Sequence, residues 1–150
     1  MKKILLGHLL SVFSIFLLAF PVKAQTEFDK YFHDQTVLWL TDHYGNNDEE
    51  YLDVAETWKF DKWAGSISQL TDPFGFGSYK FELTDLETGK VIFSQGYSTL
   101  FEEWRETSDT LKSHRHFEEG VAFPLPKKPF GVIFSKRELM NNWQVIFETN

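Results

Sequence analysis

The strongest constraint in this sequence is an alternation of apolar and polar side chains in two neighbouring segments, residues 78–86 and 90–97. In the first segment, Phe81 and Leu83 alternate with polar residues, and the second segment repeats the period of two. This period is typical of β-strands that bury one face. The residues between them, 85–89, end in glycine, as hairpin loops often do. The two segments therefore predict an antiparallel β-hairpin.

Other parts of the chain carry the same kind of signal. Segments rich in β-branched and aromatic residues, separated by turn-forming residues, predict strands over residues 35–44, 117–123, 130–136 and 143–147. One short helix is predicted at Leu100–Arg105. Six or seven short strands predict an all-β fold, a two-sheet antiparallel β-sandwich of immunoglobulin-like type. With 16 Phe and 5 Trp among 150 residues, one domain has enough apolar surface for a packed core.

Residues 1–24 are predicted to be a secretory signal peptide. Two lysines precede an apolar run over residues 4–20, and Val22-Lys23-Ala24 forms a small-residue exit. A membrane anchor is the alternative, because the run is about long enough to span a bilayer, but His8 and several serines interrupt it. We expect cleavage after Ala24, a folded domain over residues 25–150, and an extracytoplasmic location, either secreted or periplasmic.

Cysteine and charge limit the possible partners of the folded domain. The chain has no cysteine, which excludes disulfides and a lipid-modified cysteine. Removal of Lys2, Lys3 and Lys23 with the signal peptide changes the formal charge from −7 to −10. Nucleic acids and anionic lipids are bound through Lys and Arg contacts with phosphate. We therefore expect neither nucleic acid nor membrane as a partner of the mature domain.

Several segments, taken in order, resemble one known family. They are YFHDQTVLWLTDHYGN, WAGS, LTDPFGFGSYKFELTDLETGKVIFSQGYSTLFEEWRET and FEEGVAFPLPKKPFGVIFSKR. From about Tyr31 to its end, the chain is similar to the N-terminal domain of the IgA-peptidase-like zinc metallopeptidases, metallopeptidase family sixty-four. The resemblance implies a β-sandwich that precedes a zinc-carrying catalytic domain.

The zinc chemistry of such a peptidase requires the motif H-E-x-x-H, in which two histidines bind the metal and the glutamate acts as general base. No histidine in this chain begins that motif. We therefore expect no catalytic residue, metal or cofactor in this chain, with zinc confined to a catalytic domain that this chain lacks. The resemblance implies a non-catalytic accessory domain for scaffolding, docking or substrate positioning. Its expected partner is the peptidase catalytic domain or an extracellular protein.

Two segments carry residue types that can bind metal ions. His114 and His116 would lie on one face of an extended strand, with Glu118 next along that face. Arg115 lies between them and a third ligand is unassigned, so a solvated strand entry is the simpler interpretation. The stretch Asp42–Glu50 gathers carboxylates and amides, which are oxygen ligands for Ca²⁺, but not in the EF-hand order. Calcium binding there stays open.

The candidate binding residues are Trp104, Arg105, Lys127 and Lys128. In the short predicted helix, Trp104 beside Arg105 could fill a pocket of a partner, or its ring could close one end of the core. The run PLPKKP predicts an extended crossover or an edge segment with both lysines exposed, because proline has no backbone N–H to donate. A polyproline recognition loop is the alternative.

Two aromatic features remain. The stretch DPFGFG at Asp72–Gly77 lacks the strand-to-helix setting of a phosphate loop and predicts a turn before the hairpin. The five tryptophans leave a second function open, a secreted carbohydrate-binding sandwich in which indole rings stack on sugars. That function predicts two or more exposed Trp on one face.

Overall fold

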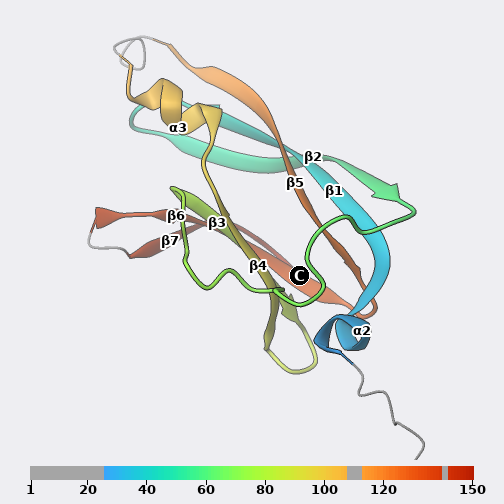
Figure 1. Cartoon of the computed structure of the whole chain (residues 1–150). Coiled ribbons are helices and arrows are strands. Elements are labelled where there is room, and N and C mark those ends of the chain that lie inside the picture. Colours follow the sequence, from blue (N-terminus) through green and yellow to red (C-terminus); the bar gives the residue numbers. More distant parts are fainter. Residues whose placement is uncertain (1–25, 108–112, 140–141) are drawn as a thin grey trace, which may run out of the picture.

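The computed structural model describes residues 26–107, 113–139 and 142–150, so the predicted signal peptide lies outside the described residues. The elements are α2 (Glu27–Tyr31), β1 (Phe32–Gly45), β2 (Glu50–Phe60), β3 (Tyr79–Asp85), β4 (Val91–Tyr97), α3 (Leu100–Arg105), β5 (Arg115–Pro126), β6 (Phe130–Arg137) and β7 (Trp143–Thr149). The strands form two antiparallel sheets, ordered β2-β1-β5 and β4-β3-β6-β7, which pack on each other (Figure 1). The predicted two-sheet antiparallel sandwich is confirmed. Within the described ranges, no helix has the length and apolar character needed to cross a membrane.

The predicted hairpin is formed by β3 and β4. Tyr79, Phe81 and Leu83 are each at most 1% exposed, so the alternation in the sequence does mark the buried face of β3. Asp85 ends the strand, because its Oδ1 accepts the backbone N–H of Thr88 at 2.8 Å and fixes the turn. Gly89 has a φ of 69°, in the left-handed region that glycine adopts without strain.

Aromatic rings join the two sheets in the core. The ring of Phe81 in β3 lies 6.2 Å from Phe123 in β5 and 5.7 Å from Phe134 in β6, centroid to centroid. Trp39 of β1 lies 5.4 Å from Phe123 with its ring edge-on. Phe81, Phe123 and Phe134 are at most 1% exposed. Their burial supplies most of the packing that stability requires in a chain with no disulfide.

Two elements were not predicted. Thr26 caps helix α2, because its side-chain oxygen accepts the backbone N–H of Asp29 at 3.0 Å. The helix has only 5 residues and leaves little periodicity to detect. Strand β2 begins at Glu50, in the stretch that the sequence suggested as a calcium loop. Residues 55–60 of β2 are all exposed, and although Trp58 and Phe60 alternate with Thr57 and Lys59, Glu56 interrupts the apolar side and weakens the signal.

The proline run lies at a sheet edge, as predicted. Pro124 and Pro126 belong to β5, the edge strand of the β2-β1-β5 sheet, and they lie opposite Thr36 and Phe32 of β1. An edge strand tolerates proline when the missing N–H faces away from its neighbour. After Pro126 the chain crosses to β6 in the other sheet, so the predicted crossover is also confirmed.

Candidate functional site

A partly buried carboxylate organises one end of the sandwich. Glu50, the first residue of β2, accepts hydrogen bonds at Oε1 from the Tyr79 hydroxyl at 2.7 Å and contacts His43 Nε2 at 2.9 Å. Its Oε2 accepts from Arg105 Nη1 at 2.8 Å and from Lys136 Nζ at 2.6 Å. The five residues come from β1, β2, β3, β6 and α3, so one side chain ties both sheets to the helix. We call this set the Glu50 network.

Burial and hydrogen bonding compete in setting the pKa of these groups. Burial by itself would raise the pKa of Glu50, but hydrogen bonds from His43, Lys136 and Tyr79 outweigh it and lower that pKa to about 2. Burial by itself would lower the pKa of His43, but the carboxylates of Glu119 and Glu50 on either side of its ring raise it. His43 Nδ1 lies 3.6 Å from Glu119 Oε2, beyond a good hydrogen bond, so that attraction is chiefly electrostatic. Glu50 therefore stays ionised.

These shifts predict a stability maximum in mildly acidic solution. Because the pKa of Glu50 is lowered in the fold, its contribution of about 3 kcal/mol is present above pH 4.5 and is lost as the pH falls toward 2. Because the pKa of His43 is raised, its contribution is present below pH 6.5 and is lost as the pH rises through its folded-state value. Urea unfolding across this range should give the largest free energy of unfolding between pH 4.5 and 6.5. The Glu50→Gln variant should have a shallower acid limb, because Asp72 and Asp85, whose pKa values hydrogen bonds also lower, still contribute to it. An unchanged acid limb in that variant would contradict the assignment.

Helix α3 carries two of the predicted binding residues, Trp104 and Arg105, and they differ in burial and in their contacts. Thr99 caps the helix by accepting the backbone N–H of Glu102 at 2.9 Å. Trp104 is 7% exposed, and its ring packs against Phe101 and Phe117. Of the two roles that the sequence left open for Trp104, the structure therefore shows a core position. Arg105 is half-buried in the Glu50 network.

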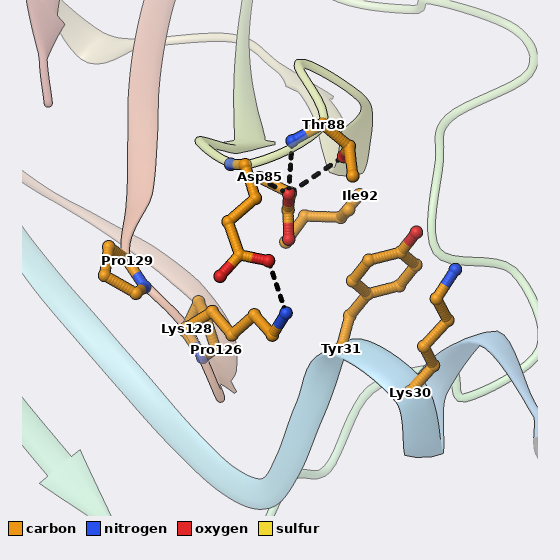
Figure 2. A pocket seen from close by; sticks show the side chains of 9 residues that line it. Lys30, Tyr31, Asp85, Thr88, Ile92, Pro126, Lys128 and Pro129 are labelled. Atoms are coloured by element: carbon orange, nitrogen blue, oxygen red, sulfur yellow. Dashed lines mark hydrogen bonds and ion pairs between the residues drawn. The ribbon is translucent and has the colours of Figure 1, made fainter.

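Lys127 and Lys128, the other two predicted binding residues, lie at the opposite end of the sandwich, between β5 and β6. The ammonium of Lys127 donates to the backbone carbonyl of Asp29, and Lys128 pairs with Glu87 at 2.5 Å. Lys128 lines a small cavity of about 90 Å³ beside Tyr31 (Figure 2). The structure thus separates the four candidates into two groups and leaves both lysine side chains exposed, as predicted.

The possible metal-binding stretches have other partners. His116 Nε2 lies 2.8 Å from Asp42 Oδ1, and His114 Nε2 lies 3.0 Å from the side-chain nitrogen of Asn46. Glu50, which the sequence placed in a calcium loop, points into the interior. Across residues 26–107, 113–139 and 142–150, no three His, Asp or Glu side chains are arranged to hold a metal ion.

The most prominent exposed aromatic pair lies on the segment between β2 and β3. Phe74 and Phe76 are each 74% exposed, and their rings stack with centroids 5.5 Å apart. The predicted turn is confirmed here, because Asp72 Oδ1 accepts the backbone N–H groups of Phe74 at 2.9 Å and Gly75 at 3.1 Å. Sequence analysis identified the turn but not the exposure of its two phenylalanines, since an aromatic residue in a turn can point either way.

This turn is held firmly against the outer face of the β4-β3-β6-β7 sheet. Arg137 Nε donates to the carbonyl of Gly77 at 2.9 Å, and another guanidinium nitrogen of Arg137 donates to the carbonyl of Gly75. Gly77 has a φ of 92°, and a Cβ there would collide with the backbone of Tyr97. A Cβ on Gly96 would likewise collide with the carbonyl of Phe76. The two glycines therefore let the turn lie directly on β4.

Two surface hollows flank the aromatic turn. One, of about 270 Å³, extends from Phe74 to Trp143 on β7. The other, of about 420 Å³, extends from Phe74 to Trp63. Pro73 and Phe74 line both hollows and form the ridge between them. We call this ridge, with Phe76 and the two hollows, the Phe74 surface. It offers a rigid apolar projection with a recess on either side, a shape suited to another protein surface.

The tryptophans do not form a common platform. Trp58, on β2, is 53% exposed, Trp39, Trp63 and Trp143 are half-buried, and Trp104 is buried. The carbohydrate-binding alternative predicted two or more exposed Trp on one face, and this arrangement does not meet that criterion.

Comparison with known protein families gives a match. Residues 27–148 match the family model described as Peptidase M64 N-terminus. The search of curated proteins found no match.

Proposed function

The chain belongs to the M64 peptidase family as its N-terminal domain, and we propose that it serves as a non-catalytic, extracytoplasmic accessory domain that binds the catalytic part of a zinc metallopeptidase. The Phe74 surface is the docking site in this proposal. The observation that carries it is the pair of 74% exposed phenylalanines on a turn that Asp72 and Arg137 hold in place.

Physical chemistry favours docking at this surface. Two adjacent exposed phenylalanines are unfavourable in water, and they gain free energy when a partner covers them. Because the turn is already fixed by hydrogen bonds, binding loses little conformational entropy there. Aromatic side chains at the centre of an interface commonly dominate its binding energy. Exposed, preorganised aromatic residues are therefore the side chains expected to serve as anchors.

The function proposed here does not use zinc. The described residues contain no group of three His, Asp or Glu suited to a metal ion, so they do not fit the metal that the family name implies. The function proposed for this chain is binding and positioning. Lys127 and Lys128, exposed at the far end of the sandwich, are a secondary candidate contact for an extracellular protein.

The Phe74 surface can be tested by binding. A catalytic domain of a family member, produced separately, should bind the wild-type chain, and the double variant Phe74→Ala/Phe76→Ala should bind about 10-fold more weakly or worse, as measured by calorimetry. Tyr51→Ala is the matched control, because Tyr51 is an exposed aromatic residue on the other sheet, and its affinity should equal that of the wild type. Equal affinity of the double variant and the wild type would contradict docking at this surface.

A further inference from the structure

The outer edge of β2 is an open hydrogen-bonding surface. Among the described residues, strand β2 is the edge of the β2-β1-β5 sheet and has β1 as its single paired strand. Its second half, residues 55–60, is exposed throughout, and Figure 1 shows its arrowhead projecting beyond the β4-β3-β6-β7 sheet. Trp58 and Phe60 on this half are 53% and 50% exposed. Long exposed edge strands are templates for pairing with another strand.

The position of Pro124 in β5 indicates which residues of β1 direct their backbone N–H and C=O groups toward β2. Pro124 lies opposite Thr36 of β1 but has no N–H to exchange, so this is a pair in which the backbone groups point away from each other. Thr36 therefore directs its N–H and C=O toward β2, where Phe60 lies opposite. The two residues form a hydrogen-bonded pair.

Along a strand, successive residues direct their backbone N–H and C=O groups to opposite sides, and this alternation shows which residues of β2 face the open edge. Two residues along, Leu38 and Trp58 form the next hydrogen-bonded pair between β1 and β2. The residues on either side of Trp58 point the opposite way, so Thr57 and Lys59 direct their N–H and C=O groups away from β1. Water hydrates these groups in the free chain, and an added extended strand can pair with all of them in a row.

The same segment of a second copy fits this row. If two copies pair antiparallel about Trp58, each Trp58 faces its counterpart at a non-hydrogen-bonded position, where cross-strand side chains come closest. Thr57 of each copy then lies opposite Lys59 of the other, and both pairs exchange their backbone hydrogen bonds. Glu56 lies opposite Phe60. No like charges face each other in this register.

Charge also permits the contact. The chain carries a formal charge of −7, which opposes self-association in general. Residues 55–62, AETWKFDK, contain equal numbers of acidic and basic residues, so the repulsion is not concentrated at this edge.

We propose that residues 55–60 of β2 bind the same segment of a second copy, joining two β2-β1-β5 sheets into one continuous sheet across a two-fold axis. This dimer is independent of the catalytic partner proposed above.

Sedimentation of the chain beginning at Gln25 tests the proposal without any partner. The wild type should pass from monomer to dimer between about 1 µM and 1 mM. Trp58→Lys places like charges opposite each other, and Thr57→Pro removes an outward N–H at an edge position, where proline is tolerated. Each variant should weaken dimerisation about 10-fold or more. The matched controls Trp58→Phe and Thr57→Val should dimerise as the wild type does.

A single cysteine tests the register directly, because the chain has none of its own. In mild oxidant, Trp58→Cys should form a disulfide-linked dimer, whereas Tyr51→Cys, on the same strand but away from the axis, should not. A wild type that stays monomeric at about 1 mM would overturn the proposal and leave β2 to a strand from another protein. Dimerisation that survives both Trp58→Lys and Thr57→Pro would also overturn it. If Thr57→Pro fails to fold, the comparison of Trp58→Lys with Trp58→Phe, together with the Trp58→Cys crosslink, decides whether this edge forms the dimer.

Discussion

Replacing Trp104 with alanine is expected to lower the free energy of unfolding by about 3–5 kcal/mol, the usual range for a large buried aromatic side chain. The ring is 7% exposed and contacts Phe101 of α3 and Phe117 of β5, so its removal leaves a cavity between the helix and the sheet. Its indole nitrogen has no hydrogen-bond partner among the described residues, so the expected loss comes from packing and not from a broken hydrogen bond.

Chemical denaturation of the Trp104→Ala variant measures this loss. Trp58→Ala serves as the control at protein concentrations below about 1 µM, where the proposed dimer does not form, because Trp58 is 53% exposed and a surface substitution usually changes stability by only about 0.5 kcal/mol. The two substitutions remove the same side chain from different environments. A Trp104→Ala variant as stable as the wild type would show that the indole does not support the core, and would favour its role as an anchor for a partner.

Replacing Glu50 with alanine is expected to cost about 3–5 kcal/mol, because it leaves buried partners of a charged group uncompensated. Arg105 and Lys136 would keep their positive charges near each other, and the Tyr79 hydroxyl would lose its nearer acceptor, at 2.7 Å, and keep only Glu102 Oε2 at 3.2 Å. Burial and Glu50 both raise the pKa of Tyr79, so this hydroxyl stays protonated and remains a donor.

The same denaturation assay tests the Glu50 network. Glu103→Ala is a suitable control, because Glu103 is an exposed carboxylate of the neighbouring helix α3. Its removal should change the free energy of unfolding by only about 0.5 kcal/mol. The Glu50→Ala variant should also show weaker ordering of α3, whose Arg105 is held by this carboxylate. A loss below about 1 kcal/mol would mean that water replaces the carboxylate at little cost.

Local patterns in the sequence were enough to predict most strands. The alternation around Phe81 identified β3 because its buried face contacts the core at every second residue. In residues 55–60 of β2, Trp58 and Phe60 alternate with Thr57 and Lys59, but Glu56 interrupts the apolar side and both faces of this half are exposed, so the signal is weaker there. An edge strand that projects from the sandwich is held by its backbone pairing with β1, and backbone pairing leaves no signature in side-chain polarity.

The site residues were harder to predict, for a different physical reason. Glu50 meets Lys136 and Arg105, which lie 86 and 55 residues away in the chain, so no local spacing indicates the network. Trp104 beside Arg105 resembled an interface anchor because a short helix can turn either residue inward. The Phe74 turn was predicted from its glycines, but the direction of its rings depends on Arg137 and on the approach of the turn to β4.

Side-chain footprinting with hydroxyl radicals tests the proposed docking most directly. In the free chain Phe74 and Phe76 should react readily, because each is 74% exposed. On addition of a separately produced catalytic domain of the family, both should lose their reactivity, while Tyr51 and Leu139, which are 49% and 90% exposed, should keep theirs. If a complex forms and Phe74 and Phe76 remain as reactive as in the free chain, the catalytic domain binds elsewhere and the docking role of this surface is wrong.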